Sequence, residues 1–164
     1  MGNFFTDTIR KDARFELPKR VSDLQLLEPG TRARVQQIIE DAKAHGVELM
    51  VYETFRSKAR QIELFNRGAS KLRDVGVHNY GLACDIVKVV DGEPSWKGDF
   101  NLIGSLAHAN GLIWGGDWGE PGRPHGFLDL VHVQRCTVAR QAALFRGDFY
   151  PDDDYDPYQE LAGK

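Results

Sequence analysis

Apolar side chains recur along the first third of the chain with the spacings of short helices and strands. Residues 31–46 repeat apolar positions at helical spacing, namely Val35, Ile38, Ile39 and Ala42. Thr31 is placed to cap this helix and Gly46 to end it. Residues 47–54 then alternate as a strand does, and Ser57 is placed to cap a second helix. The pattern predicts helix, strand and helix in succession.

The second half of the chain continues with strand-like and helix-like stretches. An apolar run predicts a strand over residues 82–90, and Asp91-Gly92 after it is a hairpin-type turn signal. Residues 111–119 are too rich in glycine for a regular element. Residues 99–110 are predicted to form a helix, residues 127–134 a strand, and residues 137–145 a last short helix.

Length and composition are those of one globular domain with flanking segments. The chain has 164 residues, of which 41% are hydrophobic and 27% charged, and this is enough for a single core. Residues 1–30 are polar and interrupted by prolines, which predicts a mostly irregular N-terminal arm anchored by Leu24, Leu26 and Leu27. Residues 148–164 form an acidic C-terminal tail whose composition is typical of disorder. We therefore expect the domain itself to cover residues 31–147.

Charge and hydropathy exclude several classes of partner. A net charge of -3 gives no general reason to bind nucleic acid or an anionic membrane. No stretch approaches the roughly 20 apolar residues that span a bilayer, and the N-terminus lacks the apolar run of a signal peptide. Cys84 and Cys136 form no CxxC pattern and are expected to be buried thiols. The expectation is a soluble monomer that is made in the cytoplasm and has no membrane anchor.

Two histidines and an aspartate stand out as candidate metal ligands. His78 precedes the first predicted strand of the second half, Asp85 lies inside it, and His132 lies in the later strand. An ionised carboxylate within the apolar run Leu82-Ala-Cys-Asp-Ile-Val87 is costly unless it is paired or metal-bound. Imidazole nitrogen and carboxylate oxygen are good ligands for Zn²⁺, and three such ligands leave a coordination position open. The alternatives are a strand-edge aspartate that faces water and a histidine with an ordinary hydrogen bond.

Asp129 lies close to His132 in the same apolar segment. In a regular strand the two side chains would point to opposite faces, so a bend is needed to bring both to one site. At such a site Asp129 would accept the proton of a water molecule and later deliver it to a leaving amine. Its alternative role is that of a hydrogen-bonded carboxylate that orients a histidine.

The spacing of these residues resembles the signatures of a known enzyme family. His78-Asn-Tyr-Gly81-Leu-Ala83-Cys-Asp85 is similar to HxxGxAxD, and Asp129-Leu-Val-His132 is similar to (D/E)xxH. Both occur in zinc peptidases that cut peptidoglycan stem peptides. These include D-alanyl-D-alanine carboxypeptidases and dipeptidases of the VanY type, and the L-alanyl-D-glutamate endopeptidases used as phage endolysins, all of peptidase family M15. Thr54-Phe-Arg56-Ser57 is similar to a third family element, an arginine after an early strand, and the resemblance spans roughly Arg34 to Gln134.

The resemblance implies a fold, a site and an activity. The fold would be a small α+β domain in which helices pack on an antiparallel sheet. His78, Asp85 and His132 would bind one zinc ion. Asp129 would be the general base and acid, and Arg56 would contact the substrate or stabilise the oxyanion.

Details of the motifs favour one branch of the family. The acid of the second signature is Asp129 rather than glutamate, and together with the preceding Gly-Leu-Ile-Trp-Gly-Gly-Asp-Trp stretch it is more like the endopeptidase branch. The expected reaction is therefore hydrolysis of the bond between L-alanine and D-glutamate. One departure is Gly76, which stands where the family often has a serine.

Three further residues have two readings each. Trp114 and Trp118 are flanked by glycines and would either floor a substrate groove or fill the core. His125 would either assist or replace a metal ligand, or lie at the surface or behind the ligands.

Other functions fit the same candidate residues. The chain could be a D,D-carboxypeptidase or dipeptidase of the same family, a non-haem iron oxygenase, whose ligand set is also two histidines and a carboxylate, or a wall-binding module without turnover. Asp129 beside the last ligand favours hydrolysis, and the presence of both Asp129 and Arg56 argues against a module without activity. A hydrolase of this kind would act on the cell wall, which it would reach without a signal peptide through a lysis pore or specialised secretion.

Overall fold

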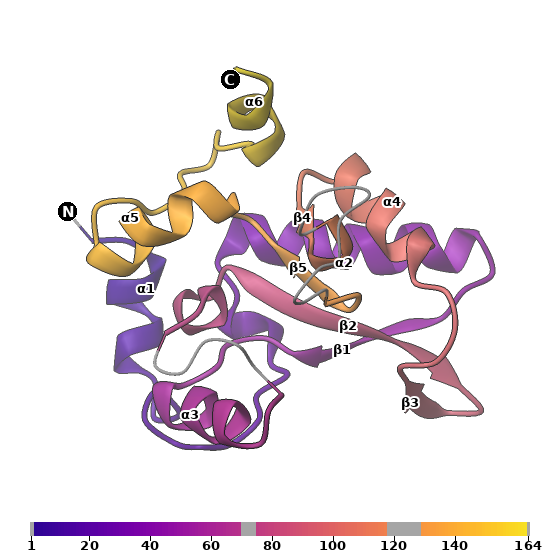
Figure 1. Cartoon of the computed structure of the whole chain (residues 1–164), viewed down its shortest axis with the longest axis horizontal. Helices are drawn as coiled ribbons and strands as arrows, with labels where there is room; N and C mark the ends of the chain where they lie inside the picture. Colours follow the sequence, from indigo (N-terminus) through magenta and orange to yellow (C-terminus); the bar gives the residue numbers. More distant parts are fainter. Residues whose placement is uncertain (1, 70–74, 118–128, 164) are drawn as a thin grey trace.

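The centre of the fold is an antiparallel sheet (Figure 1). The computed structural model describes residues 2–69, 75–117 and 129–163. The strands are β1 (Leu49–Glu53), β2 (Ala83–Val90), β3 (Glu93–Ser95), β4 (Ile113–Trp114) and β5 (His132–Gln134). Their order is β1-β2-β5-β4, and β3 pairs with the far half of β2 through the predicted Asp91-Gly92 hairpin turn. Asp91 and Gly92 both have positive φ angles, as that turn requires.

Two helices cover one face of this sheet. The α-helices of the described residues are α1 (Phe4–Asp7), α2 (Pro29–Ala44), α3 (Lys58–Asn66), α4 (Asn101–Ala109), α5 (Gln141–Arg146) and α6 (Pro157–Ala162). Helices α2 and α4 lie side by side against the sheet, and their apolar faces join it in one core that includes Val35, Ile38, Ile86, Ile103, Leu106 and Val133. The predicted α+β fold, with helices packed on an antiparallel sheet, is confirmed.

The first long helix begins earlier than its sequence pattern predicts. Helix α2 starts at Pro29, and the Glu28 carboxylate accepts hydrogen bonds from the backbone N–H groups of Gly30 and Thr31. Thr31 is thus inside the helix and is not its cap. Proline suits the first position of a helix, because it has no N–H to leave unsatisfied there. At α3 the prediction is confirmed, since Ser57 accepts a hydrogen bond from the Arg60 N–H.

The alternation of the strands divides their side chains between the core and the opposite face. On β2, Cys84 and Ile86 join the core beneath α2 and α4, so the intervening Asp85 points to the other face. On β5, Val133 joins the same core, and His132 therefore also points to the other face. Asp85 and His132 are directly opposed across the two strands, and this places both side chains on one surface.

The short β5 strand and the glycine-rich stretch differ from their predicted forms. Among the described residues β5 covers only residues 132–134, because the preceding segment turns: the His132 N–H donates to the Asp129 carbonyl at 3.3 Å. This is the bend that the Asp129–His132 spacing requires. The glycine-rich stretch does contain regular structure, in the form of the two-residue strand β4. Trp118 and His125 lie outside the described residues.

The acidic C-terminal segment is packed on the domain, which corrects the prediction of a solvated, disorder-like tail. Helix α6 lies within it, and the Tyr158 hydroxyl donates to the Leu112 carbonyl. Pro151 and Pro157 are buried, and Tyr150 donates its hydroxyl proton to the Tyr80 carbonyl. The many aspartates of the segment make its composition resemble that of a disordered chain, but its aromatic and proline side chains anchor it to the domain.

The N-terminal arm is also docked on the domain. It contains the one-turn helix α1, short 3-10 turns and extended segments, and it buries Ile9, Val21 and Leu26 against Phe55. Leu26 and Leu27 are buried and Leu24 is partly buried, as predicted for the anchors of the arm. The division into an arm, a domain and a tail stays a prediction. None of the described helices is both long and apolar enough to cross a membrane.

Candidate metal centre

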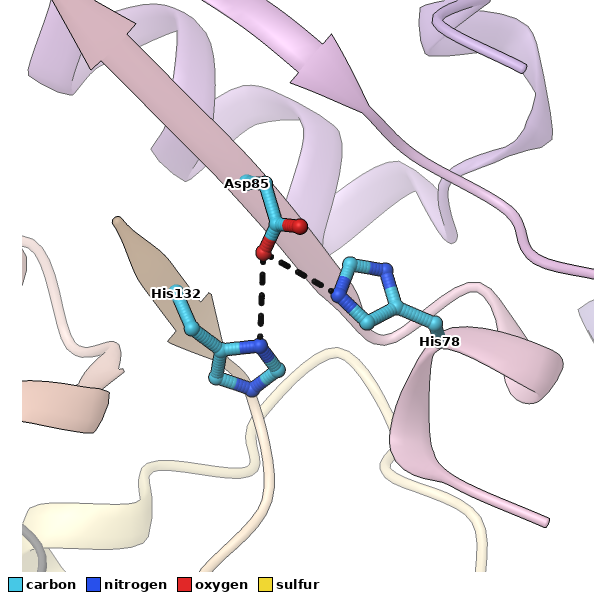
Figure 2. Close-up of side chains that lie close together, drawn as sticks. All are labelled: His78, Asp85 and His132. Carbon is cyan, nitrogen blue, oxygen red and sulfur yellow. Dashed lines mark hydrogen bonds and ion pairs between the residues drawn. The ribbon is translucent and has the colours of Figure 1, made fainter. Parts of the chain in front are cut away.

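Three candidate metal ligands converge from separate parts of the chain. His78 lies in the 3-10 turn η3 (Val77–Tyr80), Asp85 in the middle of β2, and His132 at the start of β5. One ligand atom from each of the three lies within 4.8 Å of the other two, and all three side chains are buried. Figure 2 shows both imidazole rings directed at the same oxygen of the Asp85 carboxylate. The predicted convergence of these residues is thus present in the folded chain.

His78 is held by its backbone turn and by the nitrogen that faces away from Asp85. Its Nε2 atom lies 3.2 Å from Asp85 Oδ1, and its Nδ1 atom donates to the Thr54 carbonyl at 2.8 Å. A carbonyl oxygen can only accept, so the proton resides on Nδ1 and the lone pair of Nε2 is directed at the centre. Gly81 ends the turn with a φ of 73°, and a side chain there would collide with Ile9 and the Leu26 carbonyl. The glycine of the first motif is therefore needed for space and for conformation.

His132 is oriented by a second polar side chain on the same strand face. Its Nδ1 atom lies 3.5 Å from Asp85 Oδ1, and its Nε2 atom lies 2.7 Å from the amide oxygen of Gln134. Gln134 is itself fixed, because its amide nitrogen donates to the Cys136 carbonyl. Both histidines thus have one nitrogen at the carboxylate and the other engaged by a protein oxygen, as is usual for metal-ligating histidines.

The centre concentrates charge in a buried place. Burial disfavours the charged carboxylate of Asp85, but the imidazoles of His78 and His132 and the Arg56 guanidinium hold its pKa well below the usual value. Burial also disfavours the imidazolium of His132, yet its hydrogen bond to Asp85 and the nearby charge of Asp129 raise its pKa. A positive charge is therefore favoured between these residues. Two imidazole nitrogens and a carboxylate oxygen can hold a divalent metal ion there.

Arg56 contacts the other oxygen of the Asp85 carboxylate. Its Nη2 atom lies 3.4 Å from Asp85 Oδ2, and its Nη1 atom donates to Gln61 at 3.2 Å. The Arg56 backbone is tied to the His78 turn, since its N–H donates to the His78 carbonyl and its own carbonyl accepts from the Asn79 amide. The predicted arginine therefore lies at the centre, against the Asp85 carboxylate.

Glu53 is a site residue that the sequence reasoning missed. It is only 2% exposed, and its two carboxylate oxygens accept from Arg56 Nη2 at 3.0 Å and Arg56 Nε at 3.2 Å. Arg60 Nε is 3.1 Å from the same carboxylate. The pairing of β1 with β2 shifts between Val51 and Glu53, so that Glu53 opposes Asp85. A glutamate in an apolar strand was a visible signal, of the same kind as Asp85 in its apolar run.

Asp129 is held beside the three ligands by its backbone. Its N–H donates to the Gly115 carbonyl at 3.2 Å, and its own carbonyl accepts from the His132 N–H. A side chain at Gly115 would collide with the Asp129 carbonyl, which explains why glycine precedes this segment. Burial, and then the negative charge of Asp85, raise the pKa of Asp129. Asp85 and Asp129 are thus two nearby carboxyl groups with pKa values moved in opposite directions.

Trp114 lies in the core. Its ring packs closely over Gly104 and Gly116, and its indole N–H donates to the Leu130 carbonyl at 2.8 Å. It is not among the described residues that line the cleft at the metal centre. This placement favours the core-filling reading of Trp114 over a groove floor.

The metal centre opens into a cleft of about 900 Å³. The residues of the centre line this cleft, namely Arg56, His78, Asp85, Asp129 and His132. The cleft continues to Trp96 beside β3, and to Val138, Tyr158 and Leu161 near the C-terminal segment. The lining residues thus come from the strands of the sheet, from the β3 hairpin and from α6, with the metal centre among them.

Known proteins resemble this chain in sequence. A family model described as D-alanyl-D-alanine carboxypeptidase matches residues 71–135, which contain both metal-ligand motifs. The L-alanyl-D-glutamate peptidase of Listeria phage A118 is 29% identical over 120 residues, which are 71% of this chain and 40% of that protein. The peptidoglycan L-alanyl-D-glutamate endopeptidase CwlK of Bacillus subtilis is 28% identical over 127 residues, which are 66% of this chain and 72% of that protein. The match thus spans less than half of the phage peptidase.

Solved structures share the fold. The L-Ala D-Glu endopeptidase ChiX of Serratia marcescens superposes with a TM-score of 0.57 at 24% identity, over 77% of this chain and 94% of that one. A vancomycin-resistance D,D-pentapeptidase, VanY, solved in complex with Zn(II), gives 0.51 at 17% identity, over 73% and 78% of the two chains. The predicted resemblance to the family of peptidoglycan peptidases is confirmed.

Proposed function

We propose that this chain is a zinc-dependent peptidase of that family, which hydrolyses peptidoglycan stem peptides between L-alanine and D-glutamate. The observation that carries the proposal is the convergence of His78, Asp85 and His132 beside Asp129 in an open cleft. The two relatives with the named L-alanyl-D-glutamate activity support the choice of bond. The proposed place of action is the cell wall, where this substrate occurs.

The ligand set supports zinc as the metal ion. His78, Asp85 and His132 offer two nitrogens and one oxygen, and three protein ligands are typical of a catalytic zinc site. When bound, zinc supplies Lewis acidity that polarises a carbonyl group and acidifies water. The Thr54 carbonyl and the Gln134 amide fix the two imidazole rings, so that little reorganisation is needed for binding.

Asp129 is the proposed proton carrier. Its raised pKa suits a carboxylate that takes a proton from the attacking water and returns it to the amine of the leaving D-glutamate. Asp85, whose pKa is held low, stays ionised and serves as a ligand. The opposite shifts of the two carboxyl groups match these two roles.

Arg56 is proposed to stabilise negative charge on the substrate. Its guanidinium lines the cleft and is held on one side by Glu53, which directs the remaining N–H groups toward Asp85 and the cleft. A planar donor group at this position can bind a carboxylate or the oxyanion of the tetrahedral intermediate.

A second activity is favoured by one observation. The family model that matches residues 71–135 is described as a D-alanyl-D-alanine carboxypeptidase. Such an enzyme would remove the terminal D-alanine and leave the L-alanyl-D-glutamate bond intact, so the two activities give different products.

Mass spectrometry of digested muropeptides tests the proposal and identifies the bond. Purified disaccharide-pentapeptides are incubated with the zinc-loaded protein. The expected products are a disaccharide that keeps only L-alanine and a tetrapeptide that begins with D-glutamate. Loss of terminal D-alanine alone would establish the second activity instead. An intact substrate after incubation with fully zinc-loaded protein would contradict both.

A further inference from the structure

An aromatic and cationic cluster lies on the cleft, apart from the metal ligands. Trp96 is 49% exposed, although it is a large apolar side chain, and its ring meets that of Tyr52 edge-on at 4.8 Å between centroids. The guanidinium of Arg20 lies 4.1 Å from the centre of the Tyr52 ring, and it also donates to the Tyr52 carbonyl. All three residues line the cleft. We refer to Arg20, Tyr52 and Trp96 together as the aromatic platform.

The chain builds this platform from two local irregularities. The register between β1 and β2 shifts between Val51 and Glu53, which leaves Tyr52 as the extra residue of a bulge. Bulges redirect side chains, and this bulge changes the direction of both Tyr52 and its neighbour Glu53. The hairpin from β2 to β3 then returns the chain, and Trp96 follows directly after β3. Tyr52 therefore directly precedes Glu53, the residue of β1 that pairs with Arg56.

Trp96 combines an exposed aromatic ring with a position on the cleft. Its ring contributes to the core of neither the sheet nor the arm among the described residues. An indole that is half-exposed on a cleft, supported at its edge by a second ring, offers an apolar face and a polar N–H to a ligand. The neighbouring guanidinium adds hydrogen-bond donors at the rim.

We propose that the aromatic platform is a saccharide subsite, which binds the amino sugar to which the stem peptide is attached. A pyranose ring has one face of C–H groups that can stack on an indole, and its hydroxyl and acyl oxygens can accept from a guanidinium. This inference rests on the proposed function, because the sugar of peptidoglycan is joined to the L-alanine end of the stem. A peptidase that cuts after this L-alanine must accommodate the sugar one residue away from the scissile bond.

The test compares two substrates that differ only in the sugar. One is the disaccharide-linked stem peptide, and the other is the same peptide with an acetylated L-alanine. Trp96→Ala should raise KM for the sugar-linked substrate about tenfold, which is the scale of one lost aromatic contact, and should leave KM for the free peptide unchanged. Trp96→Phe should retain most of the affinity. Val90→Ser is the matched control, because Val90 is exposed at the end of β2 but is not among the described residues that line the cleft.

A binding measurement separates this inference from the proposed activity. Titration of the unlinked disaccharide, followed by NMR, should shift the Trp96 indole N–H signal, which Trp96→Phe identifies by its loss. If the parent protein cuts neither substrate but the disaccharide shifts this signal, the proposed activity fails and the subsite stands. An equal rise in KM for both substrates, or no rise in either, overturns the subsite, as does an unshifted indole signal at saturating disaccharide.

Discussion

The described residues bury charge in two places, at the metal centre and around Arg135, and the two clusters differ in what their polar atoms contact. At Arg135, which is fully buried, Nη1 pairs with Glu28 at 2.9 Å and Nη2 donates to the carbonyls of Asp152 and Tyr155. Glu28 also accepts from the start of α2. This Arg135–Glu28 network is directed inward, and of its atoms only Arg135 Nε has no partner among the described residues.

At the metal centre the polar atoms converge on one point. Both histidines direct a nitrogen at the Asp85 carboxylate, and the group opens into the cleft. A buried charge alone therefore does not mark a functional site, because Arg135 is more deeply buried than Asp85. The informative difference is whether the charges are satisfied by the protein itself or are assembled around a place that a cation and a substrate can reach.

The largest effect is expected from removal of a metal ligand. His78→Ala, Asp85→Ala or His132→Ala should each lower bound zinc well below one equivalent and abolish hydrolysis, because two protein ligands make a weak site. Elemental analysis after dialysis measures the zinc. His108→Ala is the control, since His108 stacks on Tyr158 and does not line the cleft. Full zinc occupancy in all three variants would refute the ligand assignment.

The next effect concerns catalysis without metal loss. Asp129→Asn should retain zinc and the melting temperature, because the amide is nearly isosteric and the backbone contacts of residue 129 remain. Hydrolysis should fall by roughly 10²–10⁴-fold, the usual contribution of a positioned general base. Asp148→Asn, a change at an exposed carboxylate, is the control. Loss of zinc would make Asp129 a ligand or a support of one, and unchanged hydrolysis would assign the base elsewhere.

A substitution in the Arg135–Glu28 network should have the opposite effect, with stability lowered and zinc binding retained. Arg135→Met leaves Glu28 buried without its cation, which should lower the free energy of unfolding by about 3–5 kcal/mol while the folded protein still binds zinc. Urea denaturation of the zinc-free protein measures the change. Arg146→Met removes an exposed arginine paired with Asp148 and should cost no more than about 0.5 kcal/mol. If the Arg135 variant kept its stability but lost zinc, the distinction between the two clusters would fail.

The structural features that could be predicted from the sequence are those that depend on residues close together in the chain. Helix and strand positions followed from the spacing of apolar residues, and Asp85 was conspicuous because a carboxylate is costly in an apolar strand. The family motifs then indicated which distant histidine joins it. All of these signals lie within a few residues of each other or in a motif of fixed spacing.

The parts that were missed depend on contacts between distant residues. Strand alternation alone would place Glu53 on the core face with Leu49 and Val51, and only the register shift in β1 brings it opposite Asp85. The C-terminal segment docks where the Asp152 carbonyl accepts from Arg135 and where the Tyr158 hydroxyl donates to the Leu112 carbonyl 46 residues away, so no local pattern shows it. For Trp114 the sequence left two readings open, and the choice of the core position depends on space that Gly104, on the neighbouring helix α4, leaves for the ring.

The smallest effect separates positioning from direct action at the metal centre. Arg56→Lys keeps the charge but loses the planar donor group, so hydrolysis should fall about 10- to 100-fold with zinc unchanged. Glu53→Gln removes the charge that holds Arg56 and should cost roughly tenfold, also with zinc unchanged. If Glu53 acts through Arg56, the double variant should be no slower than Arg56→Lys alone, because the guanidinium that Glu53 positions is already absent. Rates that multiply in the double variant would give Glu53 an independent role, and a parental rate in Glu53→Gln would show that Arg56 is held well enough by Gln61 and Asp85.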